Sequence, residues 1–457
     1  MIFINTKFIP EKKDTFLVGG CVRDHLLGRP VSDFDLAVEN DARGVAAHIA
    51  SCAGRRIVII GEGEKRIYRI VTAGGAYDVS RINGPDIYAD LLERDFTINA
   101  MAVNTKTKEL LDPAGGRKDL TERLVRMLSA GAFDRDPLRL LRALRMAAVL
   151  EFSIESETLD AISAGSEKIS QIAGERIRDE WLKMLQSPFS AELIAIAART
   201  GLLFAVFPEI GKLKGCIQNR HHRLDAFDHT MRVYRATEEI LHENSPALIQ
   251  EDVKNPDLIS PPGTPELVKH AALFHDIAKP VTRSKDYNGN VHFYGHDKKG
   301  AEILQDINRR IRFSNKENLY TSFLVENHLR PLFLYILHER GKLRPKAVAR
   351  FFMKTEPRTP ELLMLAAADA QGKNAQASTQ FTDFLRDLAS RYLNNYLPAS
   401  RQPGLITGRD LISELGLEPS PLFSKIIQEI EEMRLAGLLK DRDQALRFIR
   451  EKWEKDW

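Results

Sequence analysis

The chain has 457 residues, of which 43% are hydrophobic, and its 66 lysine and arginine residues against 63 acidic residues give a formal net charge of +3. This length allows two to four domains, and the small net charge excludes a molecule that is basic all over, so any surface for nucleic acid is local. Three widely separated cysteines exclude a disulfide framework, and the absence of a signal-peptide core or a long apolar run predicts a cytoplasmic protein without membrane spans.

The first patterned stretch of the chain predicts a strand, a tight glycine turn and a short helix. The apolar run of residues 16–18 is typical of a strand, and Gly19 and Gly20 interrupt it with residues that can adopt positive φ. Without side chains, such residues let backbone N–H groups approach a ligand closely. Arg23 follows in the first turn of the helix predicted over residues 21–27. A turn of this kind can bind phosphate oxygens.

Two carboxylates follow on a second strand, where Asp33 and Asp35 flank Phe34 in the run DFDLAV. Side chains two apart on a strand point to the same face, so both carboxylates are expected beside the glycine turn. Mg²⁺ prefers one or two carboxylates together with substrate phosphates, and a pair of such ions can activate a hydroxyl and neutralise a leaving pyrophosphate. The combination indicates nucleotidyl transfer. The alternative is an ordinary turn followed by a solvated strand end.

A helix is predicted next over residues 42–53, with three further strands over residues 56–60, 68–72 and 76–79. Asp78 lies in the last of these strands, within the run AYDV. It is either a third carboxylate that faces the metal ions or an exposed strand residue.

The order GG, VRD, LLG and DFD along these elements resembles the first signature of class II tRNA nucleotidyltransferases and bacterial poly(A) polymerases, members of the polymerase-β-like superfamily. The resemblance implies an α+β head in which helices pack on a mixed sheet. It also implies that Asp33 and Asp35 hold catalytic Mg²⁺, often with a third carboxylate at the place of Asp78. The residues that would contact the triphosphate of the incoming nucleotide are Gly19, Gly20 and Arg23.

Residues 93–103, ERDFTINAMAV, resemble the second signature of the same family. Arg94 and Asp95 would contact the ribose or phosphates of the incoming nucleotide, with Asn99 one helical turn further on. Asp95 also suits the first turn of a helix, and the two interpretations are compatible. The family usually begins this signature with arginine, whereas this chain has Glu93.

After the head no further strands are predicted, and a helix is expected to begin near Asp136. It carries Arg139, Arg142 and Arg145 at intervals of three, along one face. Residues 117–145 contain eight lysine or arginine residues and four acidic residues, a local charge of 8 − 4 = +4 that exceeds the charge of the whole chain. This basic face is either a nucleotide and RNA surface or a solvated helix face.

In the family that the chain resembles, the aspartate and the first arginine of this motif read the Watson–Crick edge of the incoming base. The resemblance implies that role for Asp136 and Arg139, with Arg142 beside them. A carboxylate supplies acceptors and a guanidinium a rigid fork of donors, so the pair suits the task. Residues 175–185 resemble the last signature, whose expected role is to hold helices together through Glu175, Arg176 and Glu180.

The region from residue 200 to residue 400 is predicted to be helical, with a proline-rich surface loop near residues 245–265. Several histidines and aspartates stand out there, each next to apolar helical sequence. A single helical histidine is usually packed in a core or solvated. Imidazole and carboxylate groups together, however, suit a transition metal or Mg²⁺ that activates water for phosphate-ester hydrolysis. The residues are His229, His275, Asp276, His296, His328 and Asp369.

The order His, His-Asp, Asp resembles the HD phosphohydrolase superfamily, and HD domains occur behind the nucleotidyltransferase head in some bacterial tRNA nucleotidyltransferases. The implied activity is a metal-dependent phosphatase or 2′,3′-cyclic phosphodiesterase that repairs RNA ends. A body in which the metal is purely structural is the alternative. The resemblance implies a first ion held by His229, His275, Asp276 and Asp369, and a second that His296 and His328 help to hold.

The signatures thus predict an α+β head followed by an all-α neck, HD body and tail. The tail follows a proline- and glycine-containing linker, and its apolar residues recur with the period of an amphipathic helix. The predicted domains are residues 1–128, 129–200, 201–397 and 398–457.

The resemblance implies an enzyme that adds C, A or both to the 3′ end of tRNA from CTP and ATP and releases pyrophosphate by two-metal-ion catalysis. Only residues 81–93 separate the strand of Val79 from Arg94, and this shortness is similar to CC-adding enzymes. The alternatives are a poly(A) polymerase and an HD phosphohydrolase whose head only binds RNA.

Overall fold

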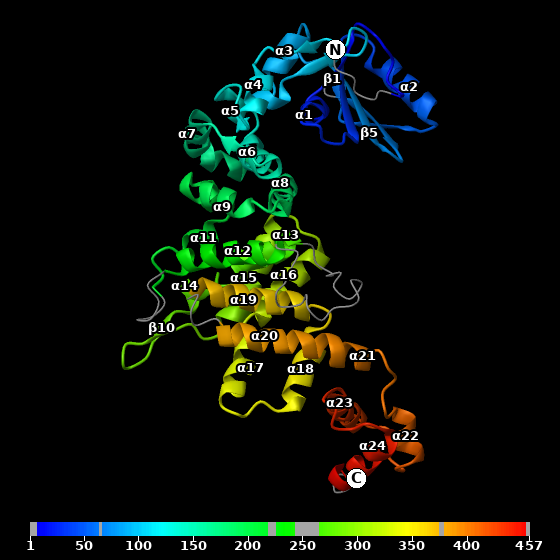
Figure 1. Ribbon diagram of the computed structural model, residues 1–457, viewed down its shortest axis with the longest axis vertical. Helices are drawn as coiled ribbons and strands as arrows, with labels where there is room; N and C mark the ends of the chain where they lie inside the picture. Colours follow the sequence, from blue (N-terminus) through cyan, green and yellow to red (C-terminus); the bar gives the residue numbers. More distant parts are fainter. Residues whose placement is uncertain (1–6, 64–65, 218–224, 243–264, 374–378, 454–457) are drawn as a thin grey trace. The chain divides into compact units, whose positions relative to one another are not determined.

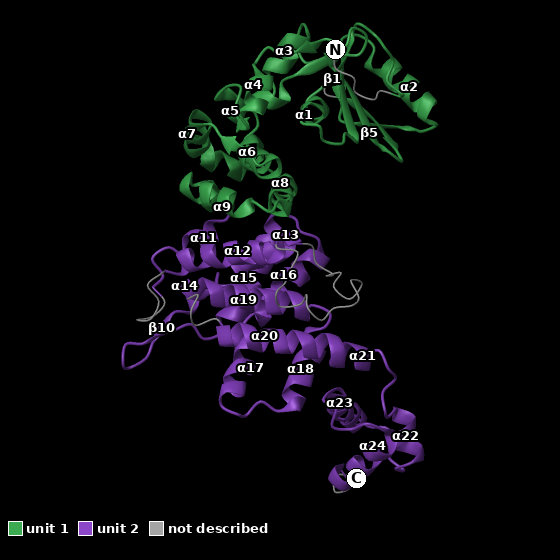
Figure 2. Ribbon diagram, in the orientation of Figure 1, with its two compact units in different colours: residues 1–206 green, residues 207–457 purple. Residues whose placement is uncertain are grey.

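The computed structural model describes residues 7–63, 66–217, 225–242, 265–373 and 379–453. Its internal contacts divide the chain into two compact units, Met1–Val206 and Phe207–Trp457 (Figure 2). The first unit contains a large sheet and a group of helices, and the second is almost entirely helical (Figure 1). Among the described residues, we find no helix whose length and apolar character would let it cross a bilayer.

A seven-stranded mixed sheet forms the core of the head, with the strand order β3-β4-β5-β2-β1-β6-β7. Strands β2 and β5 run parallel, and the other neighbouring pairs are antiparallel. The apolar residues of the central strands, such as Leu17, Leu36 and Val38, are almost completely buried, which explains why short apolar runs form strands here. The strands are β1 Thr15–Val18, β2 Asp33–Val38, β3 Ile57–Ile60, β4 Ile67–Thr72, β5 Gly75–Arg81, β6 Ala102–Asn104 and β7 Leu110–Leu111.

Helix α2 (Ala42–Ala53) packs against the sheet and has well-defined ends. The side chain of Asp41 accepts a hydrogen bond from the N–H of Gly44, and Gly54 ends the helix with a positive φ of 62°. Its buried face consists of Val45, Ala46, Ile49 and other small apolar residues. The remaining short helices of the head are α1 Gly20–Leu26, α3 Ile87–Leu92, the 3₁₀ turn η2 Thr97–Asn99 and α4 Gly116–Thr121.

The neck continues the first unit as a group of helices around α6 (Leu138–Leu150), which packs against α8 (Gly174–Gln186) and α9 (Ser190–Arg199). Leucines and alanines of α6 form its buried face, and its Arg142 and Arg145 contact Glu180 of α8. The other elements here are β8 Leu124–Val125, α5 Gly131–Arg135, β9 Ser153–Ile154, α7 Ser156–Gly165, η3 Ser166–Gln171 and α10 Leu202–Val206.

The second unit contains a helical bundle in which α12, α13, α15, α16 and α19 lie against one another (Figure 1). The bundle and its neighbours are α11 Pro208–Gly211, α12 Ala226–His242, α13 Pro265–Phe274, α14 Lys279–Thr282, α15 His296–Arg310, α16 Asn315–Asn327, α17 Arg330–Glu339, α18 Pro345–Thr355, α19 Thr359–Lys373, α20 Thr379–Arg391, the π-helical turn η6 Tyr392–Tyr396 and α21 Leu397–Ser400. The tail, with α22 Gly408–Ser413, α23 Leu422–Leu435 and α24 Arg442–Trp453, has its own apolar core.

The expectation that no strand follows the head is wrong in two places. The two-residue strand β9 pairs with β8, and β10 (Ser284–Lys285) pairs with β11 (Val291–His292) in a hairpin of the second unit. The sequence carries a signal for this hairpin, because its turn contains Asn288-Gly289 and Gly289 has a positive φ of 78°. The second signature also forms the short turn η2 and strand β6 in place of an α-helix. The predicted proline-rich loop lies outside the described residues, except for its last residue.

Candidate active sites

Three carboxylates lie on one face of the head sheet. Asp35 on β2 is opposite Asp78 on the parallel strand β5, and Asp33 shares the face of Asp35 because it is two residues away. On the other face, the rings of Phe34 and Tyr77 stack with their centroids 5.0 Å apart. The alternation of the sequence thus separates an acidic face from a packed aromatic face.

Repulsion between these carboxylates affects Asp35 in particular. Asp35 is an exposed residue, but the surrounding protein partly desolvates its carboxylate and raises its pKa; the negative charges of Asp78 and Asp33 raise it further, and the positive charge of Arg94 opposes them. A bound divalent cation relieves such repulsion, so the donor set fits a metal ion.

Asp78 stands beside Asp35 as expected, but it is also engaged by an arginine. Arg69 faces it from β4 and donates hydrogen bonds from Nε to Oδ1 at 2.7 Å and from Nη2 to Oδ2 at 2.6 Å. A metal ion that used Asp78 as a ligand would compete with this guanidinium. The pairing follows from strand register and was not predicted from the sequence.

The glycine turn brings the first and second signatures together. Gly19 has a φ of 73°, and a Cβ at this position would lie 2.9 Å from Nη1 of Arg94 and 3.6 Å from Oδ2 of Asp35. Its own N–H donates to the carbonyl of Met101. At Gly20, a Cβ would lie 3.5 Å from the guanidinium of Arg23. Glycine therefore allows the close approach of Arg94 and Asp35 at this turn.

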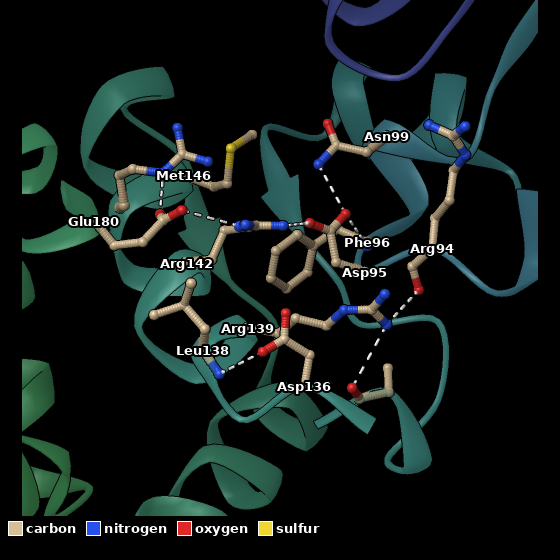
Figure 3. Close-up of polar contacts among 12 residues, drawn as sticks. Arg94, Asp95, Phe96, Asn99, Asp136, Leu138, Arg139, Arg142, Met146 and Glu180 are labelled. Carbon is tan, nitrogen blue, oxygen red and sulfur yellow. Dashed lines mark hydrogen bonds and ion pairs between the residues drawn. The ribbon is translucent and has the colours of Figure 1, made fainter. Parts of the chain in front are cut away.

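A chain of polar contacts runs from Arg23, beside the glycine turn, into the neck, and Figure 3 shows the part from Asn99 to Glu180. Arg23 donates to Oδ1 of Asn99 at 2.7 Å, and Nδ2 of Asn99 donates to Oδ1 of Asp95 at 2.9 Å. Arg142 donates to the other oxygen of Asp95 at 3.3 Å and to Oε1 of Glu180 at 3.1 Å. Burial alone would raise the pKa of Asp95, but Arg142 and the hydrogen bond from Asn99 lower it overall, so this buried carboxylate stays ionised.

The two residues that the resemblance assigns to base reading are each held by other groups. Arg139 donates to the backbone carbonyls of Glu93 and Arg94 at 3.1 to 3.3 Å. Asp136 accepts the N–H of Leu138 and forms an ion pair of 2.9 Å with Arg176. The side chain of Arg94 forms an ion pair of 3.0 Å with Asp90, besides its approach to Gly19.

Glu180 connects the neck helices, because its two oxygens contact Arg142 at 3.1 Å and Arg145 at 2.5 Å. Substitution of Glu180 by glutamine removes the charge that separates these two guanidinium groups. We expect the free energy of unfolding to fall by about 2 kcal/mol, measured by urea denaturation. The matched control is E175Q, because Glu175, which the sequence led us to expect between helices, is exposed on the same helix; we expect this substitution to leave stability nearly unchanged. Equal stability of the two variants would contradict the role assigned to Glu180.

A second cluster lies in the helical bundle of the second unit, around Asp276. Its Oδ2 is 3.1 Å from Nε2 of His275 and 3.4 Å from Nε2 of His229. Its Oδ1 is 3.3 Å from Nε2 of His296 and 4.0 Å from Nε2 of His328. The ligand atoms form two buried groups that share Asp276, each with the dimensions of a metal site.

Asp369 completes the cluster from α19. Its Oδ1 lies 3.0 Å from Nε2 of His229 and 3.8 Å from Nε2 of His275. The structure therefore brings together all six residues that the sequence singled out, from helices distant along the chain.

The imidazole rings are oriented by the backbone. Nδ1 of His275, of His296 and of His328 each lies 2.6 to 2.8 Å from the carbonyl oxygen of the residue three positions earlier. Such a hydrogen bond places the proton on Nδ1 and leaves Nε2 available to a metal. Within the described part of the chain, Nε2 of His229 and Oδ2 of Asp276 are buried and form no hydrogen bond of good geometry, although Asp369 lies close to the first and Lys279 close to the second. Buried ligand atoms in this state fit divalent metal ions.

Two lysines that the sequence analysis missed accompany these carboxylates. Nζ of Lys279 lies 2.5 Å from Oδ2 of Asp276, and Nζ of Lys373 lies 2.5 Å from Oδ2 of Asp369. Both line a pocket of about 360 Å³ together with His296. Their spacing of three or four residues from each aspartate is the sequence signal that could have found them, since such residues are neighbours on a helix.

Comparison with known proteins follows the same order along the chain. Family models match residues 15–126, as Poly A polymerase head domain, residues 151–213, as probable RNA and SrmB-binding site of polymerase A, and residues 226–371, as HD domain. The chain is 31% identical over 449 residues to the A-adding tRNA nucleotidyltransferase of Deinococcus radiodurans, covering 96% of this chain and 95% of the relative. The chain belongs to the tRNA nucleotidyltransferase family.

Other members differ in the nucleotide named in their activity. This nucleotidyltransferase is 28% identical over 449 residues to the CC-adding tRNA nucleotidyltransferase of Thermus thermophilus, covering 96% of this chain and 93% of the relative. The CC-adding enzyme of Geobacter sulfurreducens is 41% identical over 194 residues, which are 42% of this chain and 45% of the relative. Relatedness therefore confirms the enzyme family and leaves the added nucleotide to be derived from the site.

Solved structures confirm the fold predicted for the nucleotidyltransferase. The Thermotoga maritima CCA-adding enzyme complexed with tRNA has a TM-score of 0.64 at 20% identity and covers 95% of this chain and 90% of its own. A complex of a CCA-adding enzyme with ATP has a TM-score of 0.66 at 21% identity, covering 96% and 90%. At these identities the similarity shows the fold alone.

Proposed function

We propose that this nucleotidyltransferase adds C, A or both to the 3′ end of tRNA from CTP and ATP and releases pyrophosphate. The observation that carries the proposal is the pair Asp33 and Asp35 on one face of β2, with Asp35 beside the glycine turn and Arg94. Relatives of known activity, which match nearly the whole chain, support tRNA as the acceptor. A cytoplasmic location is consistent with this function.

The carboxylates of Asp33 and Asp35 would hold Mg²⁺, which supplies activation of the attacking 3′-hydroxyl and neutralisation of the leaving pyrophosphate. Arg94 and Arg23 lie beside the glycine turn, where they would bind triphosphate oxygens. Asn99 fixes Arg23 in place through a hydrogen bond, and Asp95 fixes Asn99 and Arg142 through the contacts of Figure 3. Catalysis by these residues is then mainly positioning and charge neutralisation.

Base selection is proposed for Asp136 and Arg139, with Arg142 beside them. The guanidinium of Arg139 is fixed by backbone carbonyls at the second signature, and Asp136 is fixed by Arg176. Side chains held in this way lose little entropy when they bind a base, so they suit a protein template. The tRNA itself would be recognised by the shape of its helices and by contacts to its sugar-phosphate backbone, because a double-helical stem offers side chains little sequence to read.

The preference for C is the finer part of the proposal and rests on residues 81–93. This segment is short and ordered around α3, because Asp86 accepts the N–H of Ala89, and Asp90 accepts the N–H of Asn83 and pairs with Arg94. A segment fixed by these contacts is too short and too rigid to move and change the preference of the nucleotide pocket from C to A. We therefore favour CC addition.

Extension of three tRNA substrates tests the specificity. The tRNAs end before CCA, after C and after CC, and each is incubated with Mg²⁺ and CTP, ATP or both. We expect two C residues to be added to the first substrate, one to the second and none to the third. Complete CCA would refute the preference for C, long A tails on any RNA would indicate a poly(A) polymerase, and no incorporation would favour an HD phosphohydrolase with an RNA-binding head.

The HD body is proposed to be a metal-dependent phosphohydrolase, a phosphatase or 2′,3′-cyclic phosphodiesterase that acts on RNA ends. The buried ligand atoms around His229 and Asp276 support a divalent metal ion here, and the open pocket beside them favours catalysis over a merely structural body. The pocket with Lys279 and Lys373 adds positive charge where a phosphate would lie. Metals in such a site supply an activated water.

A further inference from the structure

An aromatic ring stands at the mouth of the metal pocket of the HD body. Tyr294 follows the hairpin of β10 and β11 directly and lines the pocket with His292 and Phe293. Its side chain is 77% exposed, although a large aromatic group gains from burial. Phe333 on α17 lines the same pocket and is 54% exposed.

The ring of Tyr294 is nevertheless held in one orientation by a neighbouring ring. It stacks on the imidazole of His292 with an interplanar angle of 11° and a centroid distance of 5.1 Å. Nε2 of His292 lies 3.0 Å from Oδ2 of Asp286, and Asp286 accepts hydrogen bonds from the backbone N–H groups of Asn288 and Asn290. The aspartate therefore fixes both the hairpin turn and the histidine on which Tyr294 stacks.

The floor of the pocket has the complementary chemistry. Lys279 and Lys373 each pair with a carboxylate of the metal cluster, next to His296 and His328. A phosphate would meet these cations and the metal ligands, and a flat group attached to it would meet Tyr294. The volume of about 360 Å³ lies near the lower end of small-molecule sites, so it has room for one nucleotide.

We propose that Tyr294 is a stacking platform for the nucleobase of the phosphate ester at the metal cluster, so that the HD body recognises nucleotides and not phosphate esters in general. Stacking on an aromatic side chain is a common way to hold an unpaired base of any sequence. This inference rests on the proposed phosphohydrolase activity. In that reaction the oxygen of water bonds to phosphorus, the bond from phosphorus to the ribose oxygen breaks, and a proton released by the water passes to the ribose oxygen, which leaves as a hydroxyl.

Binding by the full-length, metal-loaded protein tests the platform. Calorimetry compares adenosine 2′-monophosphate with ribose 5-phosphate and inorganic phosphate, for the unaltered protein, Y294A and Y294F. We expect Y294A to bind the nucleotide about tenfold more weakly while its affinity for the two baseless probes is unchanged, and Y294F to retain affinity. Because the head is also proposed to bind nucleotides, the quantity to compare is the difference in nucleotide affinity between the unaltered protein and Y294A.

The matched control is Y287A, on the same hairpin, where the tyrosine is 96% exposed and does not line the pocket. It is expected to bind all three probes as the unaltered protein does. Metal content by mass spectrometry should be the same in every variant. The platform is refuted if Y294A keeps its affinity for the nucleotide, if Y287A loses as much, or if the unaltered protein binds ribose 5-phosphate equally well.

Two further measurements distinguish an RNA end from a free nucleotide as the ligand. They also distinguish a failure of the stacking platform from a failure of the phosphohydrolase activity. An RNA oligonucleotide with a 3′-phosphate that binds more tightly than the mononucleotide, in a Tyr294-dependent way, identifies an RNA end as the ligand. Tyr294-dependent binding of the mononucleotide alone identifies free nucleotides. Both outcomes support the platform. If binding depends on Tyr294 but none of these esters is hydrolysed, the platform stands and the phosphohydrolase activity fails.

Discussion

Substitution of Asp35 by asparagine is expected to lower the kcat of nucleotide incorporation by about 10³-fold, because it removes a carboxylate proposed to hold Mg²⁺ beside the glycine turn. The variant should not be less stable, since desolvation and the negative charge of Asp78 both raise the pKa of Asp35, and a neutral asparagine avoids both effects. Primer extension under single-turnover conditions, with a melting curve of each protein, measures both effects.

The matched control for this substitution is E39Q, directly after the other end of the same strand. It removes one negative charge close by in sequence and should leave kcat unchanged. Incorporation by D35N at a rate within tenfold of the unaltered enzyme would refute the assignment of Asp35 as a metal ligand.

Substitution of Asp276 by asparagine is expected to weaken divalent-ion binding to the HD body by about 100-fold or more and to abolish hydrolysis there. The reason is that Asp276 is shared by both groups of ligands and carries the charge that faces four histidines. Metal content and phosphate release measure the effect. Addition of nucleotides to tRNA should be unchanged in this variant, just as metal binding in the HD body should be unchanged in D35N.

Asp276 is only 2% exposed, so the substitution also removes the partner of the buried Lys279 and could unfold the bundle. A milder variant, H328Q, keeps this ion pair and removes one ligand of a single group. We expect it to lose part of the bound metal and to keep its melting temperature. Full metal content and full hydrolysis in both variants would refute the proposed centre.

The sequence predicted the parts of the head site that depend on local spacing. Asp33 and Asp35 are two residues apart on a strand, so their common face follows from strand geometry alone. The contact of Arg69 with Asp78 depends on the register of two strands, which the local pattern does not specify. The chain from Asp95 through Arg142 to Glu180 likewise joins residues far apart in sequence, which meet only through packing of the neck helices.

The six residues of the HD cluster spread over residues 229–369, and their spacing does not by itself reveal a site. Their residue types and apolar context singled them out, and the resemblance assigned them to metal ions, whereas their common location comes from the packing of the bundle helices. The hairpin before Tyr294 was missed because its strands have only two residues each and show no alternation. The Asn-Gly pair in its turn is a stronger signal for a hairpin than its short strands, but the expectation that strands end with the head left no place for a hairpin here.

The sharing of Asp276 between two groups of proposed ligands would couple their occupancy. An ion held by His229, His275 and Asp276 would withdraw charge from the carboxylate that also faces His296 and His328. By thermodynamic linkage, whatever the first ion does to the affinity for the second, the second does equally to the first. The binding isotherm of this centre is therefore that of one coupled pair, and its apparent affinities belong to the pair and to neither group alone.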